Sequence, residues 1–156
     1  GGKMKHVLSF YGTVNATSTN TLVSKLIAFP YSLVNIRTKF ALGQESTVQH
    51  SFFVSLDTEA PTSGTPSGRN ILKQYGQVDY VVGDDDVLEL KDETHVPEQG
   101  TYLKVLAVNS DSENHTINVI MTIDDHKVNP SLTEIMNIIK NAADILPGVN
   151  LSLETS

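Results

Sequence analysis

Alternating apolar and polar positions mark two segments near the middle of the chain. Between Val34 and Leu42, every second residue lies on one mostly apolar face, and the residues between them are mostly polar. This is the pattern of a strand with one face on a core. Residues 48–56 repeat this pattern. The polar segment 43–46 between them suits a hairpin loop. The pattern therefore predicts two neighbouring strands paired in antiparallel fashion.

The same alternation recurs later in the chain. Segments 102–107 and 117–123 flank a polar turn at 109–114, which predicts a second hairpin. Weaker strand patterns, each bounded by turn residues, cover 5–11, 22–29, 78–82 and 87–90. About eight short strands without intervening helices favour an antiparallel β-sandwich or barrel. Segment 57–69, rich in Pro, Gly, Ser and Thr, and the shorter 91–100 are predicted to be solvated loops, the first of them mobile.

The apolar period changes near the C-terminus. Residues 130–146 carry a helical apolar stripe, with Asn129 as N-cap, Pro130 at the first position and Pro147-Gly148 as the stop. We therefore expect a sandwich over 1–128, and a helix and tail over 129–156 that pack on the sandwich or on a neighbouring subunit. The stripe is wider than one sheet-facing surface needs. Its candidate oligomer-interface residues are Ile135, Ile138, Ile139, Ile145 and Leu151.

Composition supports a β-rich domain and excludes some classes of partner and of chemistry. Val, Ile and Thr together number 41 against 7 Ala, which favours strands. The net charge is −7 with two arginines, so we expect no nucleic-acid partner. Cysteine is absent, which removes disulfides and thiolate chemistry. No apolar run reaches the length of a membrane span, and no signal peptide is expected.

Candidate chemistry is sparse in this sequence. Asp84 and Asp86, next to Gly83, and Asp111 in the later turn are weak calcium ligand candidates, since carboxylates suit this ion. A solvated acidic turn is the preferred interpretation of each group. His50 lies on the inward face of its predicted strand, which favours a hydrogen-bonded core imidazole. Nucleophile, phosphate-loop and dinucleotide motifs are missing. We therefore expect neither an enzyme nor a cofactor.

Three segments, 32–56, 80–90 and 102–123, follow one another as a strand pair, an acidic Gly-Asp-Asp-Asp turn and a closing strand pair. In this order the chain resembles the single jelly rolls of virion structural proteins. The resemblance implies a jelly-roll-like sandwich that self-assembles, and we expect a viral capsid or other virion component. Its partners would be copies of itself and other virion or surface proteins. The expected location is a virion or an extracellular surface, and a cytoplasmic one stays open.

A second hypothesis is a carbohydrate-binding or cell-surface adhesion module. Its platform would use Tyr31, Phe53, Tyr75 and Tyr80 as exposed aromatic side chains, together with Asn and Asp and with calcium as an optional ligand. The absence of tryptophan and the aromatic content of 6% count against it. Large particles or stable oligomers would support the virion hypothesis. A monomer that is retained on a glycan array would support the binding-module hypothesis.

Overall fold

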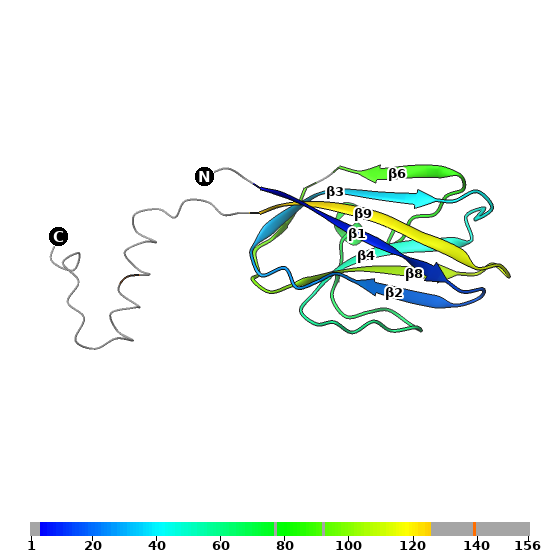
Figure 1. The fold of residues 1–156 in the computed structure, drawn as a ribbon, viewed down its shortest axis with the longest axis horizontal. Coiled ribbons are helices and arrows are strands. Elements are labelled where there is room, and N and C mark those ends of the chain that lie inside the picture. Colours follow the sequence, from blue (N-terminus) through cyan, green and yellow to red (C-terminus); the bar gives the residue numbers. More distant parts are fainter. Residues whose placement is uncertain (1–3, 77, 92, 126–138, 140–156) are drawn as a thin grey trace. The chain divides into compact units, whose positions relative to one another are not determined.

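A computed structural model describes residues 4–76, 78–91, 93–125 and 139. Within these residues the chain is mainly β, and nine strands form two antiparallel sheets packed as a sandwich (Figure 1). The strands are β1 (Lys5–Val14), β2 (Thr19–Val23), β3 (Tyr31–Phe40), β4 (Val48–Ser55), β5 (Arg69–Asn70), β6 (Asp86–Leu90), β7 (Thr94–Val96), β8 (Tyr102–Asn109) and β9 (His115–Asp125). One 3-10 helix, Leu72–Tyr75, follows β5. The predicted antiparallel sandwich is confirmed.

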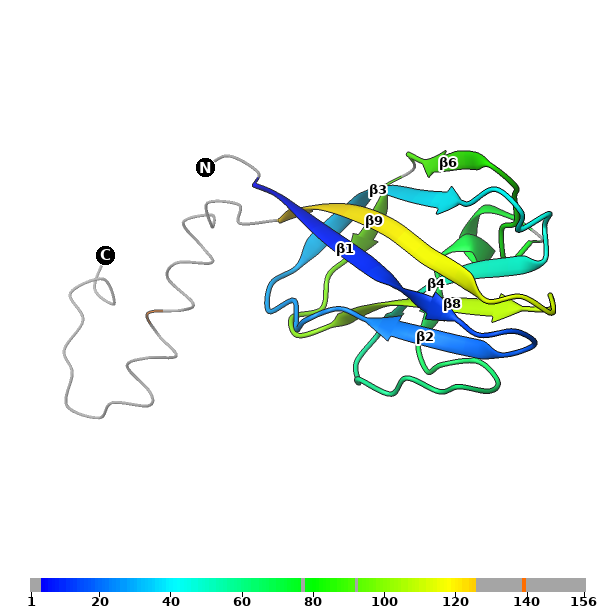
Figure 2. The same ribbon diagram turned by 45° about the vertical axis from the view of Figure 1, so that its right-hand side comes forward.

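The two sheets share the strands almost equally. The first sheet has the order β1-β9-β3-β6, with β7 beside β6 on the same edge of β3. The second has the order β2-β8-β4-β5. Figure 2 separates the two layers, with β9 and β3 in one and β8 and β4 in the other. Every strand of the described chain is therefore placed in one of two facing layers.

The strand pairing is nested along the sequence. β4 pairs with β5, β3 with β6, β2 with β8 and β1 with β9, so each pair encloses the one before it. The outermost pair joins Lys5 to Asp124. The chain is therefore arranged like one long hairpin whose tip lies between β4 and β5. This hairpin is wound so that its strands form two sheets.

Inward-facing positions of both sheets form the core. Six residues on the inward faces of the alternating segments are each at most 8% exposed: Ile36, Phe40, Phe52, Val54, Val105 and Val119. His50 is also fully buried, and its Nδ1 lies 2.7 Å from the Thr38 hydroxyl. The inward faces predicted from the alternation are therefore correct at these positions. They are wrong for Leu42 and Leu56, which lie just beyond the ends of β3 and β4 and are 77% and 73% exposed.

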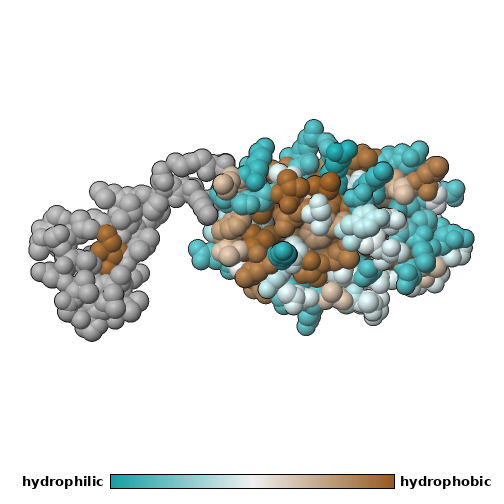
Figure 3. Space-filling model, in the orientation of Figure 1, coloured by the Kyte–Doolittle hydropathy of each residue, from teal (hydrophilic) through white to brown (hydrophobic). Residues whose placement is uncertain are grey.

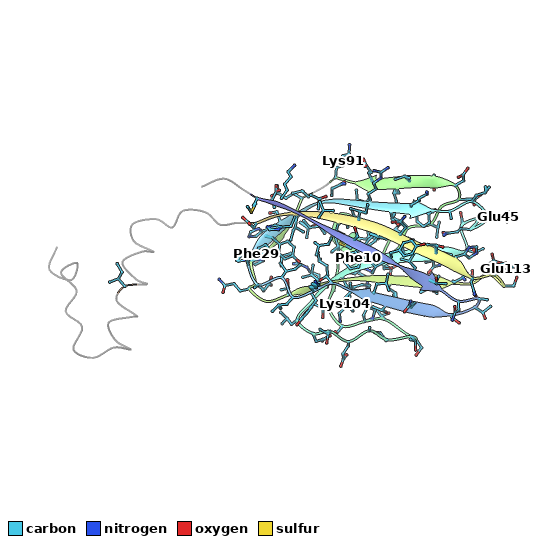
Figure 4. All side chains as sticks on the ribbon, viewed as in Figure 1. Phe10, Phe29, Glu45, Lys91, Lys104 and Glu113 are labelled. Carbon is cyan, nitrogen blue, oxygen red and sulfur yellow. The ribbon has the colours of Figure 1, made fainter. Side chains whose placement is uncertain are left out.

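The two predicted hairpins are wrong. β3 and β4 lie in different sheets, as do β8 and β9, so the segments 41–47 and 110–114 cross between the layers. Figure 4 shows this through Glu45 and Glu113, which label the two crossings at one end of the sandwich. Facing sheets are about 10 Å apart, a gap that five to seven residues span easily. Alternation identifies the buried face of a strand but does not identify its partner.

Two weaker strand assignments and one loop assignment also change. The predicted strand 78–82 is reduced to a single bridge between Val81 and His50. The predicted strand 22–29 ends at Val23, although Ile27 bridges Thr101. The predicted loop 91–100 contains β7, which is held by the first residues of β3. A three-residue strand is too short for alternation to reveal it in the sequence.

The outer face of the first sheet carries exposed apolar side chains. Val7 and Tyr11 on β1 are 66% and 74% exposed. Ser9 between them pairs with Ile120 of β9, which faces the same side. Val7, Tyr11 and Ile120 together are called the β1 patch below. Figure 3 shows apolar surface along β1 among polar neighbours.

The predicted C-terminal helix and the interface residues Ile135, Ile138, Ile145 and Leu151 lie outside the described residues. Ile139 is described, and its backbone is helical. In the part of the chain that is described, no helix combines the length and apolarity that crossing a membrane requires.

Candidate binding groove

The outer face of the second sheet supplies the floor of a groove. Register places outward-facing residues of β2, β8 and β4 in cross-strand rows. One row is Thr19, Val108 and Gln49, and the next is Thr21, Leu106 and Ser51. Hydroxyl and amide groups thus flank a central line of apolar side chains on β8. The floor offers both hydrogen-bonding groups and an apolar strip.

The next row, Val23, Lys104 and Phe53, lies toward the segment that follows β4. Residues 56–68 fold back over this sheet and form the first wall. Thr21 donates a hydrogen bond to the Pro61 carbonyl at 2.7 Å, and Pro66 is buried. The sequence predicts a solvated loop here. That prediction is correct for most of the segment, which is exposed, and wrong at its anchor points, where the loop covers Lys104, the one charged side chain of the row.

Lys104 holds this wall in place. Its side chain is 0% exposed, and its Nζ donates to Asp57 Oδ1 at 2.8 Å and to Ser67 Oγ at 3.2 Å (Figure 4 labels Lys104). Ser67 Oγ in turn donates to both Asp57 carboxylate oxygens. Hydrogen bonds from Lys104 and then Ser67 hold the pKa of the Asp57 carboxyl well below its usual range. Asp57 at the start of the loop and Ser67 at its end are therefore held together, and both are held to β8, by the buried Lys104 ammonium.

Gly68 closes the wall against β4. Its φ is +121°, and a Cβ built there would lie 2.4 Å from the Val54 carbonyl oxygen. Contacts below 3.0 Å with backbone cannot be relieved by a side-chain rotation, so a larger residue would push the loop off the sheet. The wall thus depends on glycine at this position.

The second wall comes from residues 70–76 and 78–81. The Asn70 Nδ2 donates to the Asp79 carbonyl at 2.9 Å, and the Asn70 Oδ1 accepts from the Leu72 N–H at 2.9 Å. Paired backbone bonds between His50 and Val81 fasten the end of this segment to β4. Asn70 and the bridge therefore hold the wall at both ends.

The two walls enclose a groove of about 580 Å³ on the sheet. This volume lies in the range of small-ligand sites. Most lining side chains are uncharged, some of them polar and some apolar. Lys73 adds one positive charge and Asp79 one negative charge. The lining is Thr19, Gln49, Ser51, Phe53, Gly64, Thr65, Gly68, Asn70, Lys73, Asp79, Tyr80, Leu106 and Val108. The site can form hydrogen bonds and offers an apolar surface, with no net charge.

The calcium candidates do not come together. Asp84 Oδ1 accepts hydrogen bonds from the backbone N–H groups of Gly43 and Glu45, and so caps the crossing after β3. Asp86 begins β6 opposite Phe40. In the described residues there is no group of three His, Cys, Asp or Glu side chains suited to a metal ion.

Asp111, the third candidate, lies in the other crossing segment. Its Oδ2 is 2.8 Å from His115 Nε2, and its Oδ1 accepts from the Ser112 N–H at 2.7 Å. These hydrogen bonds, that of His115 first, lower the pKa of the Asp111 carboxyl. The Asp111 carboxylate thus stabilises the turn between β8 and β9 through these hydrogen bonds.

The predicted aromatic platform is only partly present. Tyr31 is 0% exposed in the core, where burial raises its pKa to about 12, so its place in an exposed platform was wrong. Phe53 lines the groove but is 3% exposed. Tyr80 is 38% exposed and lines the groove, whereas the side chain of Tyr75 lies outside the described part. Tyr80 is thus the predicted platform residue that stays both exposed and in the groove.

Sequence reasoning missed the role of Lys104 and the polar floor. Lys104 occupies an outward position on its strand, which predicts a solvated side chain, and only a loop more than 30 residues earlier removes it from water. The alternation of β4 does place Gln49 and Ser51 on its outward face, but it does not indicate that loops enclose them in a groove.

The comparisons with known proteins add no relative to this picture. No protein-family model matches the chain, and no curated protein matches its sequence.

Proposed function

We propose that this protein is a non-enzymatic jelly-roll subunit of a homo-oligomeric assembly, specifically a viral capsid or other virion component. The nested pairing of β4 with β5 out to β1 with β9 carries the proposal. A long hairpin wound into two four-stranded layers is the jelly-roll arrangement, and this arrangement serves in capsid proteins and in lectins. The additional strand β7 extends one edge without changing that order.

The β1 patch favours assembly over a solitary module. Val7 and Tyr11 leave most of their surface in water on β1, which is the edge strand of its sheet. Apolar side chains beside an open edge are features that soluble monomers usually avoid, and association covers both. We assign this surface to contact with a neighbouring subunit.

The experiment is a mass measurement with matched variants. Sedimentation velocity and negative-stain microscopy of the purified chain should give defined oligomers or closed particles. Val7→Lys should reduce the assembled mass, because a charge is costly in a dry interface. Leu56→Lys is the control, since Leu56 is also exposed (73%) but follows β4 in the other sheet. A monomer at every concentration, or equal effects of both variants, contradicts the proposal.

The sequence-derived interface of 129–156 gives an independent test. Ile138→Asp lies on the flank of the predicted helical stripe and should lower the assembled mass while thermal unfolding of the sandwich stays unchanged. A variant that unfolds the sandwich instead would place this residue in the subunit core. A variant that leaves the mass unchanged would remove 129–156 from the interface.

A further inference from the structure

We infer that the groove on the β2-β8-β4-β5 sheet binds an oligosaccharide. This inference does not depend on assembly, because every residue that lines the groove belongs to one chain. Sugar rings present hydroxyl groups that need paired donors and acceptors, and C–H faces that pack on apolar surface. The groove provides both, on the scale of a few rings.

The polar lining has the right chemistry for hydroxyl groups. Thr19, Gln49 and Ser51 project from neighbouring strands on the same face. The Gln49 side-chain amide forms no hydrogen bond with any described residue, so its donor and acceptor are both open to a ligand. An amide of this kind can bridge two adjacent hydroxyl groups of one ring.

The apolar part of the lining suits the sugar faces. Leu106 and Val108 run along the floor, and Tyr80 stands at the second wall with 38% of its surface exposed. An aromatic ring with one apolar face and a hydroxyl at its tip can pack on a sugar ring and hydrogen bond to it. Tyr80 is therefore expected to be the stacking residue.

The charges of the groove argue for a hydroxylated ligand over an anionic polymer. Lys73 and Asp79 contribute opposite charges to the lining, and the chain as a whole carries −7. A phosphate or sulfate chain needs several unpaired cations along its path. The ammonium of Lys104 does not serve, since it is fully buried against Asp57.

The groove is also built before any ligand arrives. Its floor consists of hydrogen-bonded strands, and its walls are fixed by Lys104 with Asp57 and by Asn70 with the Asp79 carbonyl. A ligand that enters a formed site does not have to order the loops around it. This preorganisation favours binding of a flexible, strongly hydrated molecule such as an oligosaccharide.

The test begins with the full chain on an array of neutral and acidic oligosaccharides of defined sequence. The best-retained oligosaccharide is then titrated calorimetrically into the wild type and three variants. Gln49→Ala and Tyr80→Ala should each weaken binding about tenfold, the loss of one good contact. Asn118→Ala is the matched control, because Asn118 is a half-buried amide on the outer face of the other sheet. It should bind like the wild type.

Several results would overturn the inference. Retention of no oligosaccharide at millimolar concentration would do so, as would binding that Gln49→Ala and Tyr80→Ala leave unchanged. Retention of sulfated chains alone, abolished by moderate salt, would indicate diffuse charge and not the groove. Sedimentation of Gln49→Ala and Tyr80→Ala should show unchanged mass, so failure of this inference is separate from failure of the proposed assembly.

Discussion

Acidification should destabilise the sandwich through His50. This imidazole is fully buried, stacks on Phe40 with ring centroids 4.7 Å apart, and meets the Thr38 hydroxyl through Nδ1. Its Nε2 is buried without a hydrogen-bond partner, so a second proton would have no acceptor within the described residues. Burial lowers the pKa of His50 from 6.5 to about 4.

The sign and size of the effect follow from this pKa. Above pH 6.5 His50 is neutral in both the folded and unfolded chain, so it adds no pH dependence. Between pH 6.5 and about 4 the unfolded chain takes up a proton that the folded chain refuses, and the free energy of unfolding falls by about 1.4 kcal/mol per pH unit. Below about pH 4 this loss levels off, at a total of about 3 kcal/mol.

Carboxylates act in a different window. The lowered pKa values of Asp57 and Asp111 stabilise the fold above their ordinary value of 3.8, and that contribution is lost as the pH falls below it. The contribution of His50 can therefore be measured between pH 7.5 and 4.5, where these two carboxylates add little pH dependence.

The assay is urea unfolding at half-unit steps across this interval, for the wild type and for His50→Gln. Glutamine keeps a polar group near the Thr38 hydroxyl and removes the titration. The variant should start less stable at pH 7.5, lose less with acid, and approach or exceed the wild type at pH 4.5. Parallel curves for the two proteins would refute the reasoning, because they would mean that His50 takes up its proton equally in both states.

The remaining predictions concern packing, the first groove wall and calcium. Phe52→Ala should cost about 3–5 kcal/mol in urea unfolding, because Phe52 is 0% exposed in the core, and an unchanged midpoint would refute its inward assignment. Asp57→Ala should lower the melting temperature more than Lys104→Met, because the first leaves a buried ammonium without its carboxylate and the second leaves a carboxylate that water can reach; the reverse order in calorimetry would contradict the pairing. Millimolar CaCl₂ should leave the melting temperature unchanged, because Asp84 already binds two backbone N–H groups; a rise of several degrees would show a calcium site.

Strands were predictable from the sequence, but strand partners were not. Period-two alternation located most of β3, β4, β8 and β9 and oriented residues such as Phe52 and Val105 inward. Pairing depends on which sheet a strand joins after a crossing, and a crossing of five to seven residues has the composition of a hairpin loop. Local patterns therefore predicted the strands and their buried faces, but not the sheet that each strand joins.

The groove was harder to predict for a related reason. Each lining residue is ordinary by itself, and the site exists because the loop after β4 returns to cover Lys104. An outward lysine is expected to be solvated, and its burial depends on Asp57 and Ser67, which no periodicity connects to β8. Enclosure comes from long-range contacts, and these leave no local pattern.

The nested pairing also favours one order of strand pairing during folding. The tip pair, β4 with β5, closes a loop of about a dozen residues, whereas β1 must find β9 across more than a hundred. Closing the larger loop costs more entropy, so pairing that proceeds outward from the tip meets the lowest barriers. On a ribosome β1 emerges first and acquires its partner last. The β1 edge, with Val7 and Tyr11 exposed on it, thus stays unpaired until β9 has been made, and during that time it can associate with other nascent chains.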